Sequence, residues 1–123
     1  MIKNFTDLKA WEEAHKLTLL IYKVTKTFPK DEMFGLISQI RRAAISIESN
    51  IAEGFARFHY KDRLIFYFQA RGSASEVESQ LITSKDLGYI TEREFQEIFD
   101  QAEKAGIILS GLIRSTENLS SKK

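Results

Sequence analysis

The fold is decided by residues 37–55, ISQIRRAAISIESNIAEGF, in which apolar residues recur at steps of three and four. The recurring positions are Ile37, Ile40, Ala44, Ile47, Ile51 and Gly54. On an α-helix this alternation gathers the apolar side chains on one stripe of the surface. Such a stripe must be covered by other parts of the protein, so the stretch predicts an amphipathic helix packed against further elements.

The same alternation occurs in three more segments, within residues 14–28, 67–81 and 95–112. The period of two that is typical of half-buried strands is not sustained anywhere in the chain. We therefore predict an all-α protein. The predicted helices cover residues 6–28, 32–57, 61–88 and 91–117.

The ends of the first two helices are predicted from short polar residues and from the single proline. Thr6 is a candidate N-cap for the first helix, because its hydroxyl can accept from a free backbone N–H group. Pro29 disfavours helical geometry at the residue before it, so we expect the first helix to end at Phe28. Asp31 is a candidate N-cap for the second helix.

The second half of the chain carries sharper boundary signals. Gly88 is a candidate glycine after the C-terminus of the third helix, and Thr91 with Glu94 forms a T-x-x-E capping box for the fourth. Gly72 is followed by Ser-Ala-Ser, which could cap a new helix. Because the apolar stripe passes this point in phase, we expect one continuous third helix.

Short connections determine how the helices are arranged. The predicted loops have about three to six residues, which is too few for a crossover and favours antiparallel neighbours. The chain has 123 residues, no cysteine and one proline, which predicts a single domain over residues 1–123. The fold class is therefore an antiparallel up-down-up-down four-helix bundle.

Composition and motifs do not indicate an enzyme. Eighteen basic and 17 acidic residues leave a net charge of only +1, which is unlike a strongly basic nucleic-acid binder. Residues 12–15 contain the E-x-x-H spacing of di-iron bundles, but the second E-x-x-H that such a site needs is missing, since Ala56 stands three residues before His59. No glycine-rich phosphate loop or nucleophile motif is present. We expect no catalytic residue, metal, cofactor or small-molecule substrate.

The N-terminal residues MIKNFTD do not resemble a secretory signal. The chain also contains no apolar run of about 18 residues that could span a bilayer. We therefore expect a cytoplasmic protein without a membrane partner.

Two helix faces carry polar and small residues that invite a close helical neighbour. The residues considered for oligomer or structural polar contacts are Arg42, Ser46, Asn50 and Glu53 in the second helix and Gly72, Ser73, Glu76 and Glu78 in the third. Arg42 and Glu53 are about three turns apart, so they cannot pair on one helix. Either these faces meet another helix or chain, or they are solvated outer faces.

Aromatic residues are concentrated around the predicted turn between the second and third helices. The candidates for an aromatic interface are Phe55, Phe58, Tyr60 and Phe66. One end of a small bundle cannot bury all of them, and large exposed apolar patches usually mark interaction sites. We expect some of these side chains to lie in an oligomer contact.

Basic residues are concentrated in the same part of the chain. The candidates for nucleic-acid binding are Arg41, Arg42, Arg57, Lys61, Arg63 and Arg71. Arginine with aromatic residues can hold a nucleic-acid backbone and stack on bases. The alternative is that they pair with the acidic residues of segment 72–103, which the nearly neutral net charge favours.

In these segments the chain resembles a bacterial family, the 23S rRNA intervening-sequence proteins, which are also described as ribosomal-protein-like. The resemblance lies in FTDLKAW (5–11), QIRRAAISIESNIAEGF (39–55), ARGSASEVE (70–78) and LGYI (87–90). The most specific of these motifs is the core of the second, SIxSNIAEG. In this chain Glu48 occupies a position where family members commonly have proline.

The resemblance implies an antiparallel four-helix bundle that assembles into a homopentameric ring. It implies no settled activity, although association with ribosomal RNA has been supposed. A looser kinship links the chain to pentameric accessory subunits of reverse transcriptases that bind nucleic acid. The functional expectation is a non-catalytic pentamer associated with rRNA or another nucleic acid. The alternative is a protein-binding assembly or adaptor module with no nucleic-acid role.

Overall fold

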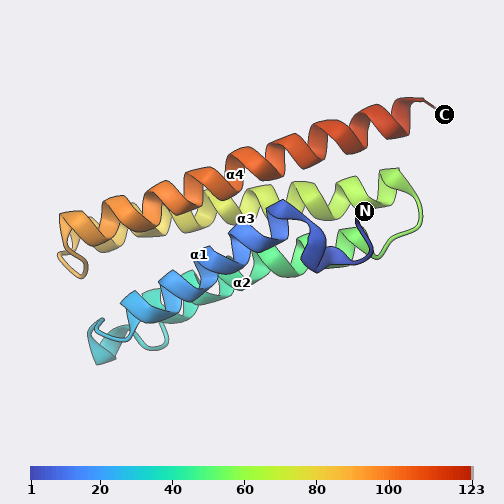
Figure 1. The fold of residues 1–123 in the computed structure, drawn as a ribbon. Coiled ribbons are helices and arrows are strands. Elements are labelled where there is room, and N and C mark those ends of the chain that lie inside the picture. The colour runs from blue at the N-terminus through green and yellow to red at the C-terminus, as the bar shows by residue number, and fades with distance from the viewer. Residues whose placement is uncertain (123) are drawn as a thin grey trace.

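The computed structural model describes residues 1–122 and consists of four long helices arranged as a rod (Figure 1). The helices are α1 (Lys9–Thr25), α2 (Leu36–Phe55), α3 (Tyr60–Asp86) and α4 (Glu92–Ser121). Each packs against the helix before and after it in the chain, and α4 closes the bundle against α1. The predicted all-α, up-down-up-down bundle is confirmed, and the described residues contain no strand.

The predicted caps of the first two helices are wrong. Asn4, not Thr6, caps a short 3-10 turn at Phe5–Asp7, and α1 begins only at Lys9. A second 3-10 turn at Lys30–Glu32 contains Asp31, so α2 begins at Leu36. There the Glu32 carboxylate accepts a hydrogen bond from the Leu36 backbone N–H at 3.1 Å. Local hydrogen bonds in the connections thus shorten both helices relative to the apolar pattern.

The predicted boundary between the third and fourth helices is confirmed. Gly88 has φ +80°, and the backbone N–H groups of Gly88 and Tyr89 close the end of α3, as in a Schellman motif. Thr91 and Glu94 form the expected capping box. As expected, α3 is continuous through Gly72, whereas α4 runs to Ser121, four residues beyond its predicted end at 117.

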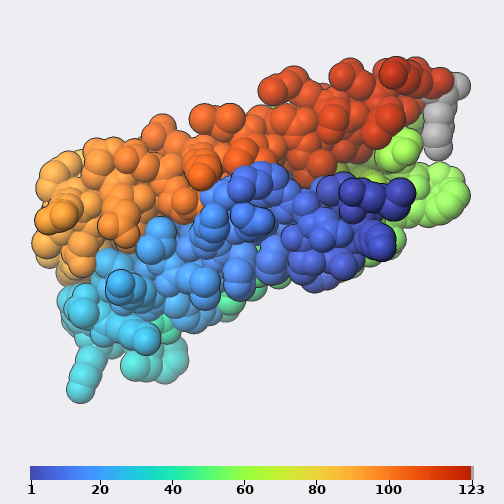
Figure 2. Space-filling view, viewed as in Figure 1, coloured from blue at the N-terminus to red at the C-terminus, as the bar shows by residue number. Residues whose placement is uncertain are grey.

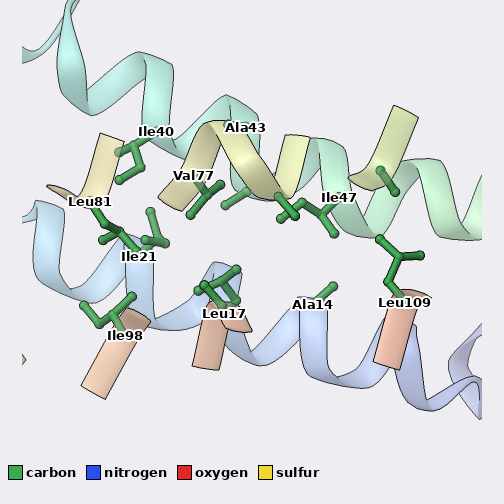
Figure 3. Packing of buried hydrophobic residues seen from close by; sticks show 14 of the residues in the cluster. Ala14, Leu17, Ile21, Ile40, Ala43, Ile47, Val77, Leu81, Ile98 and Leu109 are labelled. Atoms are coloured by element: carbon green, nitrogen blue, oxygen red, sulfur yellow. The ribbon is translucent and has the colours of Figure 1, made fainter. Parts of the chain in front are cut away.

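The core lies along the axis of the rod and is built from the predicted apolar stripes (Figure 3). Leu17, Ile21, Ile40, Leu81 and Leu109 are fully buried there. Each such side chain stabilises the fold by about 1.5–3 kcal/mol relative to an exposed one. Packing of four stripes against one another therefore holds the bundle together.

The close approach of α2 and α3 depends on Gly54. A Cβ atom at this position would lie 2.7 Å from the Tyr67 ring and 3.1 Å from the Arg63 carbonyl oxygen. Tyr67 itself is buried in the core. Glycine is therefore required at this position of α2, because the Tyr67 ring of α3 packs directly against the backbone there.

Figure 2 shows α1 and α4 side by side on one face of the rod, with the α1–α2 connection projecting from one end. The α1–α2 and α3–α4 connections share that end, where the Tyr89 hydroxyl donates to Glu32 at 2.9 Å and its ring lies 5.3 Å from that of Phe28. The α2–α3 turn therefore lies at the opposite end of the rod.

Candidate functional site

The α2–α3 turn gathers three basic side chains with several aromatic rings. Arg57 lies over the Phe66 ring at 4.6 Å, and Arg63 lies over the Phe55 ring at 4.9 Å. The Arg63 Nε–H also donates to the Arg57 carbonyl oxygen at 2.8 Å. These cation–π and hydrogen-bond contacts hold the turn in one conformation.

The outermost part of this turn is open to solvent. Phe58 is 86% exposed, and its ring meets that of His59 edge-on. Lys61 is exposed in the first turn of α3. Beside it lies an open cleft of about 440 Å³, lined by His59, Tyr60, Lys61, Asp62 and Ser120. We call the exposed group Arg57, Phe58, His59 and Lys61 the basic tip.

The structure does not unite all six predicted basic residues in one patch. Arg41 is half-buried against α1, where it lies over the Tyr22 ring at 4.6 Å and donates to the Thr25 hydroxyl at 2.8 Å. Arg42 lies on the outer face of α2, and Arg71 stands over the Phe68 ring of its own helix. The remaining three, Arg57, Lys61 and Arg63, lie at the α2–α3 turn.

Three residues of the predicted polar set form hydrogen bonds where α2 packs against α3. The hydroxyl groups of Ser46 in α2 and Ser73 in α3 are 2.8 Å apart. The Asn50 side-chain amide donates to the Ser46 carbonyl oxygen at 2.8 Å. The Ser46–Ser73 bond joins α2 to α3, and the Asn50 bond, which lies within α2, holds the same region of that helix.

The other five residues of that polar set are exposed or half-buried. Glu53 pairs with Arg57 at 3.1 Å, Glu76 accepts a hydrogen bond from Gln80, and Glu78 is half-buried. Arg42 forms no ion pair with any residue of the described chain. A Cβ atom at Gly72 would find no described atom within 4 Å.

The two histidines do not form a metal centre with acidic neighbours. His15 stacks on the Trp11 ring at 4.7 Å, and its Nδ1 lies 3.2 Å from a Glu48 carboxylate oxygen. Glu48 therefore joins α2 to α1 through His15. No group of three potential metal ligands occurs among residues 1–122.

A buried carboxylate in α1 was not anticipated from the sequence. Glu13 is fully buried, and its Oε1 accepts from the Gln101 amide at 2.9 Å. Lys9, Lys16 and Lys104 approach its two oxygens at 3.2–3.5 Å. The Gln101 hydrogen bond, opposed by burial and aided by the lysines, lowers the pKa of Glu13 to about 2.

A sequence signal for this carboxylate does exist. Glu13 lies on the apolar side of α1 between Ala10 and Leu17, and lysines stand four residues before it and three after it. Such i, i+3 and i, i+4 spacing brings opposite charges together on a helix. The two partners from α4 have no local signal.

No helix in residues 1–122 is both long and apolar enough to cross a membrane.

Comparison with known proteins gives a family and a fold but no activity. No match was found among curated proteins. A crystal structure from Bacteroides thetaiotaomicron, of a protein with unknown function from the S23 ribosomal protein family, superposes with a TM-score of 0.76. It is 22% identical and covers 85% of this chain and 97% of its own. That likeness supports the four-helix fold alone.

The sequence itself supplies the family. Residues 6–111 match the family described as 23S rRNA-intervening sequence protein. The match begins before α1 and ends within α4, so it includes the basic tip and both polar faces. The chain belongs to the 23S rRNA-intervening sequence protein family.

Proposed function

We propose that the protein is a non-catalytic homopentamer that associates with RNA, with cytoplasmic ribosomal RNA as the candidate ligand. The contact is made by the basic tip. The proposal rests on one observation, the presence of an exposed aromatic ring between exposed basic side chains at one end of the rod. The family's name and the homopentamer implied by the family resemblance agree with it.

The chemistry of the basic tip suits a nucleic-acid backbone with unstacked bases. Arg57 and Lys61 offer charged donors to phosphate oxygens, which gives affinity without reading sequence. Phe58 offers a free ring face on which a base can stack. Single-stranded loops of RNA present both groups together.

Assembly explains how a chain with a net charge of only +1 could bind a polyanion. A ring whose axis runs along the rods places every copy of the basic tip at the same end. Linked weak contacts then act together, because each later contact is intramolecular. The proposed function therefore depends on local charge and valency more than on net charge.

The test measures binding of single-stranded and hairpin fragments of 23S rRNA by their retention on a filter, at about 50 and about 200 mM salt. We expect binding that weakens as salt rises. The variant Arg57→Ala/Lys61→Ala is expected to lose about tenfold in affinity and to reduce the salt dependence. Phe58→Ala is expected to lose about 1–3 kcal/mol of binding free energy.

Matched controls lie at the other end of the rod. Lys26→Ala/Lys30→Ala removes two exposed lysines there, and Phe34→Ala removes a ring that is 94% exposed. Both variants should bind RNA as the parent does. Absence of salt-dependent binding, or equal losses in the control variants, would refute the role given to the basic tip.

A protein-binding adaptor is the second candidate function. Its supporting observation is the apolar tip at the α1–α2 connection, where Met33 and Phe34 are both exposed. An adaptor would be retained on a specific protein through this tip and not on RNA. If a protein partner is captured by the parent chain but lost with Phe34→Ser, and RNA is not bound, this second function replaces the first.

A further inference from the structure

A groove between α3 and α4 is left uncovered by the bundle. Its volume is about 390 Å³, and its lining includes the small residues Ala74, Ser75, Gly106 and Ser110. Ile107 stands at its edge with 71% of its surface exposed. Small residues allow close approach of another helix, and the exposed isoleucine offers it an apolar contact.

The groove is acidic at one end and basic at the other. Because α3 and α4 are antiparallel, Glu78 lies near Glu103, while Arg71 lies toward Arg114. Burial, and then the charge of Glu103, raises the pKa of Glu78. None of the four side chains forms an ion pair within residues 1–122. The acidic end therefore lacks a cation and the basic end lacks an anion.

The outer face of α2 carries the complementary features. Its exposed residues, in order, are Gln39, Arg42, Ile45, Ser49 and Glu53. Ile45 is 41% exposed, and Arg42 has no ion-pair partner among residues 1–122. The pair of Glu53 with Arg57 is half-exposed on both sides, so it contributes little and can be exchanged.

The spacings of the two surfaces agree. Arg42 and Glu53 are eleven residues apart, about 16 Å along the helix. Glu103 and Arg114 are also eleven residues apart. Ile45 follows Arg42 by three residues in α2, and Ile107 follows Glu103 by four residues in α4. A parallel alignment of α2 with α4 therefore sets each charge against its opposite and one isoleucine against the other.

The two surfaces also lie at the same level of the rod. Ser46 is hydrogen-bonded to Ser73, and the next residue, Ala74, lines the groove together with Gly106 and Ile107. Position 46 in α2 is therefore level with about position 106 in α4. The charged residues on either side are level with their proposed counterparts as well.

Rotation about an axis along the rods preserves this arrangement. Such a rotation keeps the direction and the level of every helix, and α2 and α4 run in the same direction in an up-down-up-down bundle (Figure 1). The contact joins two different surfaces, so it is heterologous and can close into a ring. A second copy of this chain is thus the occupant whose shape, charge order and level fit the groove.

We infer that the outer face of α2 seats in the α3–α4 groove of a second copy, with Arg42 beside Glu78 and Glu103 and with Glu53 beside Arg71 and Arg114. This inference rests on the homo-oligomer of the proposed function and names the surfaces that form it.

The test is a charge exchange followed by native mass spectrometry and sedimentation over a dilution series. The variants are Arg42→Glu, Glu103→Arg and the two combined, all at exposed positions. Each single reversal should raise the concentration for half-dissociation at least about tenfold, because it places like charges together. The combined variant should return to within about threefold of the parent. Circular dichroism checks that all three remain helical.

Lys26→Glu and Glu97→Arg are the matched controls, since both residues are exposed and lie outside the two surfaces. They should leave the oligomer unchanged. The inference is overturned if both single reversals leave dissociation of the oligomer unchanged, or if the combined variant does not recover the behaviour of the parent. The groove would then be left to a different protein. The homo-oligomer itself would still stand in that case. A parent chain that is monomeric throughout the series overturns both.

Discussion

At the scale of single residues, two glycines inside helices have opposite surroundings. A Cβ atom at Gly54 would clash with Tyr67, whereas one at Gly72 meets no described atom within 4 Å. We predict that Gly54→Ala lowers the free energy of unfolding by about 1–3 kcal/mol through overpacking. Gly72→Ala should raise it by about 0.5–1 kcal/mol, because glycine is costly in a helix interior. Urea unfolding measures both, and equal effects would contradict the close α2–α3 contact.

The buried carboxylate of Glu13 predicts a dependence of stability on pH. Its pKa is lowered from 4.5 to about 2 in the folded protein. The ionised group therefore stabilises the fold above about pH 4.5, and this contribution is lost as the pH falls from there toward 2. Glu13→Gln should lower the free energy of unfolding at pH 7 by about 1–2 kcal/mol. The free energy of unfolding of this variant should also change less than that of the parent between about pH 5 and about pH 2.

Glu12→Gln is the matched control for this change. Glu12 also lies near Lys9 and Lys16, but its side chain is about half exposed. Exposed ion pairs on a helix contribute little, so this variant should unfold much as the parent does at pH 7. If the two glutamines have the same effect, burial of Glu13 is not what makes its charge important.

At the scale of elements, helix ends depend on specific caps as well as on apolar pattern. The Thr91 hydroxyl accepts from the Glu94 backbone N–H at 3.1 Å, and the Thr91 backbone N–H donates to the Glu94 carboxylate at 2.8 Å. Thr91→Ala should lower the free energy of unfolding by about 1 kcal/mol. Thr83→Ala, an exposed position inside α3, should have no cost or a slight gain, because alanine favours helices. Thermal unfolding measures both variants, and an equal loss of stability in the two would contradict a specific role of the Thr91 cap.

At the scale of the whole molecule, the proposed homopentamer makes a prediction about mass. The chain has a mass of 14.2 kDa, so a homopentamer has about 71 kDa, five times that mass. We predict this mass at micromolar concentration by native mass spectrometry. The ion pairs proposed between copies are partly solvated and are screened by salt, so the protein concentration for half-dissociation should rise as the salt concentration rises. A mass near 14 kDa at micromolar concentration would contradict the pentamer.

Local pattern in the sequence determined the four helices and the sharpest boundary. The three-four alternation placed Leu17, Ile47 and Leu81 in the core, and the T-x-x-E box placed the start of α4 correctly. Both signals act over one or two turns of a helix, so they survive without any knowledge of the neighbouring elements. The same alternation placed Gly54 on the buried stripe, but it gave no sign that the Tyr67 ring lies against that position.

Only the tertiary structure decided which polar residues meet. Glu13 accepts a hydrogen bond from Gln101 of α4, which is 88 residues away in the sequence. Ser46 is hydrogen-bonded to Ser73 across the α2–α3 contact. Packing of the whole core sets the rotation of each helix about its own axis. That rotation determines which polar side chains come together. The same rotation sends Arg41 against Tyr22 while Arg57 and Lys61 remain at the exposed end. Periodicity defines which face of a helix is buried, but the partner of each remaining side chain depends on where the other three helices lie.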